Sequence, residues 1–119
     1  MVLITRYWAT LPAPPDDRTM LDRQVVAAGE VAAALGLLVE SSPPVKVGQV
    51  KWDARFRGPE GDWVEFSTIK DWAPPGQAAG RTLVIKAPTS GKMHAAFSTR
   101  VAEMLGVRFR PVVHYSRDV

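Results

Sequence analysis

The chain has 119 residues and a net charge of +3, with 46% hydrophobic and 23% charged residues, a composition that indicates one globular domain and excludes a disordered chain. It contains no cysteine, which excludes a disulfide, a thiolate metal site and a cysteine nucleophile and fits a reducing compartment. No run reaches the ~20 apolar residues of a membrane span, and we find no signal peptide. We therefore expect one cytoplasmic domain over residues 1–119, with no membrane partner and no cofactor.

The first elements expected along the chain are a strand, a helix and a short strand. Residues 1–9 are rich in β-forming side chains and end at a proline-rich connector, because proline cannot continue a ladder. A helix is expected from about residue 16 or 19 to Leu35, since its apolar side chains recur on one stripe. Gly36 is expected to end this helix. Residues 37–40 are expected to extend as a short strand.

A hairpin is expected next. Residues 45–57 alternate between apolar and polar side chains, with a phase slip near Gly48 that predicts a bulge. Residues 58–62 have the composition of a turn, and residues 63–72 alternate again as the return strand. Residues 73–80 contain two prolines and two glycines without a charge, which predicts a mobile loop.

The C-terminal third predicts a strand, a helix and a last strand. The segment 82–87 is short and strongly apolar, which favours a strand at a central position in the sheet. Thr89 or Ser90 is expected to cap an amphipathic helix that follows. Residues 107–115 alternate as a strand, and Pro111 within them favours an edge position because it lacks an N–H.

These elements predict an α+β fold: a two-layer sandwich with two helices packed on one mainly antiparallel sheet, in the order β-α-β-β-β-α-β. One core is expected from the apolar stripe of each element. Its members are Val25, Leu35, Trp52, Phe56, Val64, Phe66, Leu83, Ile85, Phe97, Val101, Phe109 and Val113.

The leading functional prediction is a basic sheet face. Residues 81–119 carry seven basic and two acidic side chains, which points to an anionic partner. Strand alternation places basic residues opposite the core, and an exposed tryptophan is expected beside them. Single-strand binders combine such arginines with a stacking aromatic. The predicted nucleic-acid-binding residues are Lys51, Arg55, Arg57, Trp63, Arg108, Arg110 and His114, in a basic, non-enzymatic binding module.

A helix start provides a second candidate anion site. Ser90, Gly91 and Lys92 follow a strand and precede a helix, so they could hold one phosphate at the helix N-terminus. The full phosphate-loop motif is absent, because Ile85 stands at its first glycine position and Met93 at its hydroxyl position. We therefore do not predict a nucleotidase.

Two other functions stay open. Trp72, beside the 73–80 loop, is a candidate protein contact, so the chain could instead be an accessory or inhibitor protein of the phage or mobile-element type. His94 and Ser98 lie one helical turn apart, and a serine–histidine pair would suit a small hydrolase or transferase. No metal site is predicted, and the sequence leaves the oligomeric state and the choice between DNA, RNA and protein open.

Overall fold

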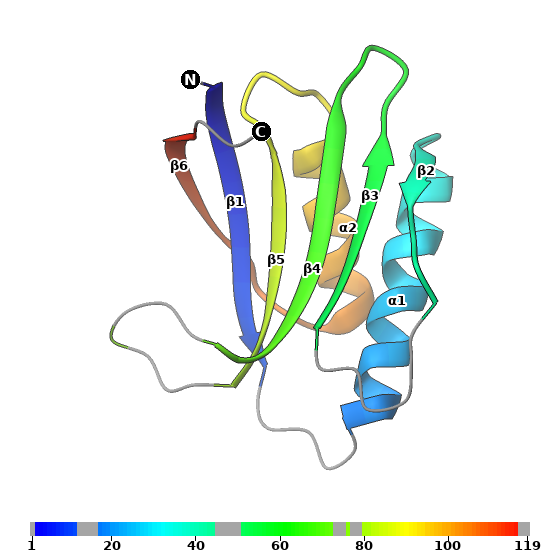
Figure 1. Ribbon diagram of the computed structural model, residues 1–119, viewed down its shortest axis with the longest axis vertical. Coiled ribbons are helices and arrows are strands. Elements are labelled where there is room, and N and C mark those ends of the chain that lie inside the picture. The colour runs from blue at the N-terminus through cyan, green and yellow to red at the C-terminus, as the bar shows by residue number, and fades with distance from the viewer. Residues whose placement is uncertain (1, 12–16, 45–50, 73–75, 77–79, 117–119) are drawn as a thin grey trace.

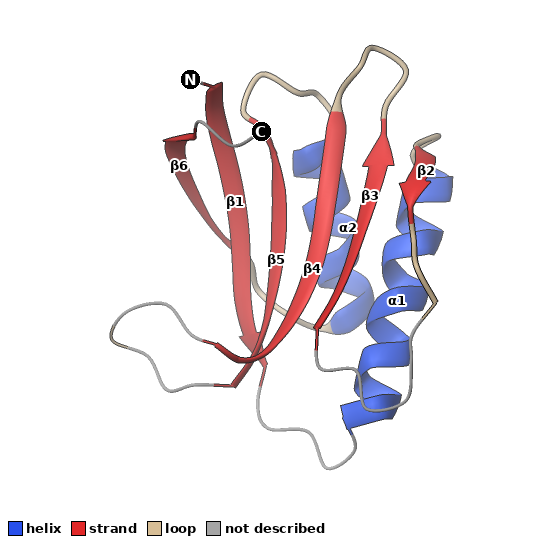
Figure 2. Cartoon of the chain, viewed as in Figure 1, coloured by secondary structure: helices blue, strands red, loops and turns tan. Residues whose placement is uncertain are grey.

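The computed structural model describes residues 2–11, 17–44, 51–72, 76 and 80–116. A sheet forms one layer and two helices form the other, and both helices cover the same face of the sheet (Figure 1). The predicted α+β sandwich is confirmed (Figure 2). The elements in chain order are β1 Val2–Leu11, α1 Asp17–Ala34, β2 Leu38–Ser41, β3 Lys51–Arg57, β4 Trp63–Trp72, β5 Gly80–Pro88, α2 His94–Leu105 and β6 Arg110–Ser116.

The sheet has six strands in the spatial order β2-β3-β4-β5-β1-β6, and every neighbouring pair is antiparallel. The short strand expected at residues 37–40 is present as β2, although the predicted order of seven elements did not count it. Strand β5 is internal, as its apolar sequence predicted, and β6 lies at one edge, as Pro111 predicted. The expected bulge near Gly48 and most of the 73–80 loop fall outside the described residues.

The predicted start of the second helix was wrong. Helix α2 begins at His94, and its N-cap residue is Met93, which makes no side-chain capping bond. The Thr89 hydroxyl lies 2.8 Å from that of Thr5, and the Thr89 N–H donates to the Leu3 carbonyl. Thr89 therefore continues the pairing of β5 with β1, and the helix starts only after a further turn.

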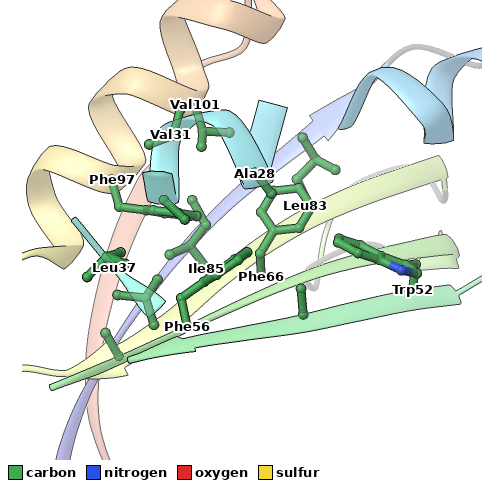
Figure 3. Packing of buried hydrophobic residues seen from close by; sticks show 14 of the residues in the cluster. Ala28, Val31, Leu37, Trp52, Phe56, Phe66, Leu83, Ile85, Phe97 and Val101 are labelled. Carbon is green, nitrogen blue, oxygen red and sulfur yellow. The ribbon is translucent and has the colours of Figure 1, made fainter. Parts of the chain in front are cut away.

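The core lies between the helices and the sheet (Figure 3). Phe97 and Val101 of α2 enter it from one helix and Ala28 and Val31 of α1 from the other. The rings of Phe56 and Phe97 have centroids 5.8 Å apart, so β3 and α2 meet through aromatic contact. Eight of the predicted core residues are fully buried: Trp52, Phe56, Val64, Phe66, Leu83, Ile85, Phe97 and Val101.

The core prediction was wrong for Val113, which is 52% exposed. Val25, Leu35 and Phe109 are partly buried and pack against the edge of the core. Helix α2 packs on β5, and α1 packs on β2 and β4. Strand β6 lies two positions beyond β5, so the side chain of Val113 points to the helix side of the sheet where no helix lies above it.

A hydrogen-bonded pair joins α2 to β1. The Tyr7 hydroxyl lies 2.8 Å from His94 Nδ1, and His94 Nε2 lies 3.3 Å from the Thr89 carbonyl oxygen. Because a carbonyl can only accept, Nε2 carries a proton; in the neutral imidazole, Nδ1 then accepts and the tyrosine hydroxyl donates. Burial raises the pKa of Tyr7, which keeps the donor protonated.

We expect Phe97→Ala to lower the free energy of unfolding by about 3–5 kcal/mol, because it removes a fully buried ring and leaves a cavity. Met104→Ala on the same helix is the control, since Met104 is 44% exposed, and it should cost less than about 1 kcal/mol. Urea titration monitored by circular dichroism measures both. Equal losses for the two variants would show that α2 does not bury the face that carries Phe97.

We expect Tyr7→Phe to cost about 0.5–1.5 kcal/mol, because it removes the hydroxyl that donates to His94. The native pKa of Tyr7 lies above its ordinary value of 10.0. The contribution of Tyr7 is therefore complete below about pH 10 and is lost as the pH rises through the native pKa. Urea titrations from neutral to alkaline pH should show a steeper alkaline loss for the native chain than for Tyr7→Phe. Parallel curves would contradict this assignment.

Candidate nucleic-acid interface

The face of the sheet that carries no helix is turned toward the viewer in Figure 2, and we call it the open face. Residues directly opposite each other on antiparallel strands point to the same face. Arg55 of β3 is opposite Glu65 of β4, Glu65 is opposite Lys86 of β5, and Lys86 is opposite Arg6 of β1. The core residues Ala54, Phe66 and Ile85 alternate with these positions. A row of four charged residues therefore crosses the open face.

Trp63 lies on the open face next to this row. The guanidinium carbon of Arg55 is 4.2 Å from the centroid of the Trp63 ring, and Lys86 Nζ is 6.0 Å from it. Trp63 is opposite Arg57 and is half-buried. The indole therefore stands among cations from two strands, an arrangement in which cation–π attraction holds the side chains together.

A second tryptophan repeats this arrangement on β1. Trp8 is opposite Arg110 of β6, and the guanidinium carbon of Arg110 is 5.4 Å from the centroid of its ring. Trp8 is half-buried. The sequence prediction did not include Trp8, Arg6 or Lys86. Alternation along residues 1–9 groups Arg6 with Trp8, but both faces of that strand carry apolar side chains, so the pattern does not say which face is covered.

Ordinary strand and residue spacings place the backbone positions of the two tryptophans about 16 Å apart across the sheet. Trp8 is two strands away from Ser67 in the same row, and Trp63 is four residues along β4 from Ser67. This places them about 10 Å apart across the strands and about 13 Å along them. The row of Arg6 and Lys86 lies between. The open face therefore presents an indole, a pair of cations and a second indole along one diagonal.

Carboxylates neutralise one side of the open face. Glu40 Oε2 lies 3.0 Å from Arg55 Nε, and Glu40 Oε1 lies 2.6 Å from Arg57 Nη2. Glu65 Oε2 lies 3.6 Å from Arg55 Nη1. Within the part of the chain that the structure describes, the N–H of Arg55 Nε has no hydrogen-bond partner, so its contact with Glu40 is an ion pair only. Arg55 and Arg57 of β3 are therefore paired with carboxylates. The alternation of residues along β3 predicted the face of these arginines but not their ion pairs.

The predicted residues divide between locations. Arg55, Arg57, Trp63, Arg110 and His114 occupy open-face positions. Lys51 has the same register parity as Arg55, and its side chain lies outside the described residues.

Arg108 does not join them. It lies in the connection between α2 and β6 and lines a groove on the helix side with Tyr7, Ser98 and Phe109. The expectation that Arg108 and Arg110 share a face was wrong. The alternation of apolar and basic residues begins at residue 107, but strand β6 begins only at Arg110.

The helix-start anion site already contacts a carboxylate. The backbone N–H of Lys92 donates to Asp62 Oδ2 at 2.8 Å, and Lys92 Nζ lies 3.1 Å from Glu60 Oε2. The N–H of Gly91 donates to the Pro88 carbonyl. Acidic side chains of the β3–β4 turn thus occupy the position that a phosphate would need at Ser90, Gly91 and Lys92.

His94 and Ser98 do not form a nucleophile–base pair. The Ser98 hydroxyl donates to the backbone carbonyl of His94 at 2.8 Å, one turn back along the helix. Both imidazole nitrogens already have partners in Tyr7 and Thr89. The geometry gives the serine no activating base.

Trp72 ends β4, and its side chain lies outside the described residues, as does most of the adjoining loop. Among the described residues, no group of three His, Cys, Asp or Glu side chains is arranged to hold a metal ion. Neither described helix is long and apolar enough to cross a membrane.

Comparisons with protein-family models, with curated proteins and with solved structures found no match for this chain.

Proposed function

We propose that this protein is a non-enzymatic module that binds single-stranded nucleic acid through its open face. The observation that carries the proposal is the repeated pairing of a half-buried tryptophan with cations on the sheet face that carries no helix: Trp63 with Arg55 and Lys86, and Trp8 with Arg110. Cytoplasmic location, expected from the sequence, belongs to the same proposal.

Stacking supports a single strand over a duplex. Unpaired bases can stack on indole rings and on arginine planes, whereas the bases of a duplex are already stacked on each other. An open sheet presents such surfaces side by side. Each base stacked on an aromatic side chain contributes about 1–3 kcal/mol, without strong preference for one base. The tryptophans would therefore supply much of the affinity and little sequence selectivity.

Charge supports phosphate contact at the β1–β6 side of the open face. Arg6 and Arg110 have no carboxylate partner among the described residues. Arg55 and Arg57, by contrast, are balanced by Glu40 and Glu65. Phosphates would thus contact Arg6 and Arg110 at the β1–β6 side of the open face, and the β3 arginines would mainly orient Trp63.

We expect single-stranded DNA or RNA to bind with an affinity that falls as salt rises. If Arg6 and Arg110 each neutralise one phosphate, the slope of log affinity against log salt should be about −1.4. Arg110→Ala should reduce the magnitude of that slope by somewhat under one unit. Arg100→Ala, on the exposed side of α2, is the matched control and should leave the slope unchanged. Fluorescence-anisotropy titrations at several salt concentrations measure it.

We expect Trp8→Ala and Trp63→Ala each to weaken single-strand binding by about 5- to 150-fold, the equivalent of one lost stacking contact. Trp63→Phe should restore most of the loss because it keeps an aromatic face. Circular dichroism checks that each variant is folded.

Four probes decide the outcome: single- and double-stranded forms of DNA and of RNA. No binding to any of them at low salt would overturn the proposal. Duplex binding as tight as single-strand binding, unaffected by the tryptophan variants, would overturn the stacking mechanism and leave only phosphate attraction.

A further inference from the structure

We infer that β6 is a dimerisation edge, through which two copies of this chain join their sheets by antiparallel pairing of β6 with β6. This inference does not rest on the proposed nucleic-acid function. Strand β6 ends the described sheet on one side (Figure 1).

The hydrogen bonds of β1 show which backbone groups of β6 face outward. The N–H of Thr89 donates to the carbonyl of Leu3, so the odd-numbered residues of β1 direct their backbone groups toward β5. The even-numbered residues, including Ile4 and Arg6, therefore bond to β6, opposite His114 and Val112. The backbone groups of Pro111, Val113 and Tyr115 point away from the sheet, at an edge that no other described strand pairs with.

Proline is tolerated at this edge because its missing N–H faces outward, where no ladder bond within the sheet is lost. Pro111 still offers its carbonyl, and Val113 and Tyr115 each offer an N–H and a carbonyl. A row of backbone groups that have no partner strand among the described residues is a template for another strand.

The side chains along this edge are apolar and exposed. Val112 is 49% exposed, Val113 52% and Tyr115 69%. Val113 and Tyr115 point to the helix side of the sheet, and Val112 to the open face. The opposite edge strand, β2, has only four residues, one of which is Glu40 in its ion pairs. Strand β6, with seven residues, is the longer of the two edges.

The sequence of β6 is self-complementary about its centre. The midpoint of Arg110–Ser116 is Val113, so full overlap of two copies places Val113 opposite the partner's Val113. Tyr115 then faces the partner's Pro111, and Val112 faces the partner's His114. Arg110 is the only arginine of β6, and in this register it lies opposite the partner's Ser116. No two arginines therefore oppose each other.

This register also uses the outward backbone groups efficiently. The two Val113 residues exchange two N–H···O bonds, and each Tyr115 N–H donates to the partner's Pro111 carbonyl. Four bonds form although each strand contains a proline. A shift of one position toward the N-terminus would place Arg110 opposite the partner's His114. A shift toward the C-terminus would place His114 opposite the partner's His114. The central register avoids both contacts.

The groove beside α2 gives Tyr115 a place to pack. It has a volume of about 440 Å³ and is lined by Tyr7, Val107, Phe109 and Pro111, among others. Because Tyr115 faces the partner's Pro111, its ring would lie at the rim of the partner's groove. The two-fold axis repeats this contact, as closed symmetric dimers require. A second copy therefore fits this edge better than an unrelated strand, which would supply neither the matching tyrosine nor the symmetry.

Sedimentation equilibrium over about 1–200 µM tests the dimer, with a dissociation constant expected in about the micromolar range for so small an interface. The native chain should approach twice its 13.0 kDa mass. Val113→Lys should weaken the dimer by about tenfold or more, because two ammonium groups would meet across the axis. Val39→Lys is the matched control: Val39 is 63% exposed on the opposite edge strand, and the variant should dimerise as the native chain does.

A cysteine variant tests the register, and this test does not require the fold to accommodate a lysine at position 113. The chain has no cysteine, so Val113→Cys introduces a single thiol that should form a disulfide-linked dimer under mild oxidation, whereas Val39→Cys should stay monomeric on a denaturing gel. A native chain that remains at 13.0 kDa throughout the concentration range would overturn the inference. So would dimers that Val113→Lys and Val39→Lys weaken equally. Loss of nucleic-acid binding alone, with the dimer intact, would overturn only the proposed function.

Discussion

Two helices cannot cover a six-stranded sheet, and the rest of this structure follows from that constraint. Packed helices lie about 8–10 Å apart, so a pair of them spans about 20 Å. Six strands at about 4.8 Å spacing span about 24 Å between the outermost backbones alone. The helices lie over β2, β4 and β5, with Phe97 packed against Phe56. Part of the helix-side surface of β1 and β6 therefore has no helix above it. Neither described helix lies on the opposite face of the sheet.

Each uncovered surface has its own chemistry. On the open face, indole rings lie beneath the guanidinium groups of Arg55 and Arg110, an arrangement in which long cationic side chains shield apolar area while their charges remain hydrated. On the helix side of β6, Val113 and Tyr115 have no such cover. The first surface suits an anionic, stacking ligand, and the second suits another apolar strand.

The two proposed surfaces are compatible. Pairing of β6 with a second β6 would use the edge and the helix side and leave the open face accessible. It would also bring the Arg110 and Trp8 pairs of two copies near one axis, because Arg110 belongs to the edge strand and Trp8 to its neighbour. A polymer that crossed from one copy to the other would then gain effective concentration from the second site.

Local sequence patterns predicted the main helices and strands apart from the start of α2, the internal position of β5, the edge position of β6 and most of the core. These features are local: apolar spacing of two or about 3.6 residues defines a strand or helix face, and one proline marks an edge. The sequence also grouped Arg55 with Arg57, because alternation within one strand needs no tertiary knowledge. Only the tertiary structure placed Arg108 on the helix side, exposed Val113, paired Arg57 with Glu40 and set Trp8 beside Arg110. Each of these depends on which distant strands become neighbours and how far the helices reach, and no local pattern encodes either quantity.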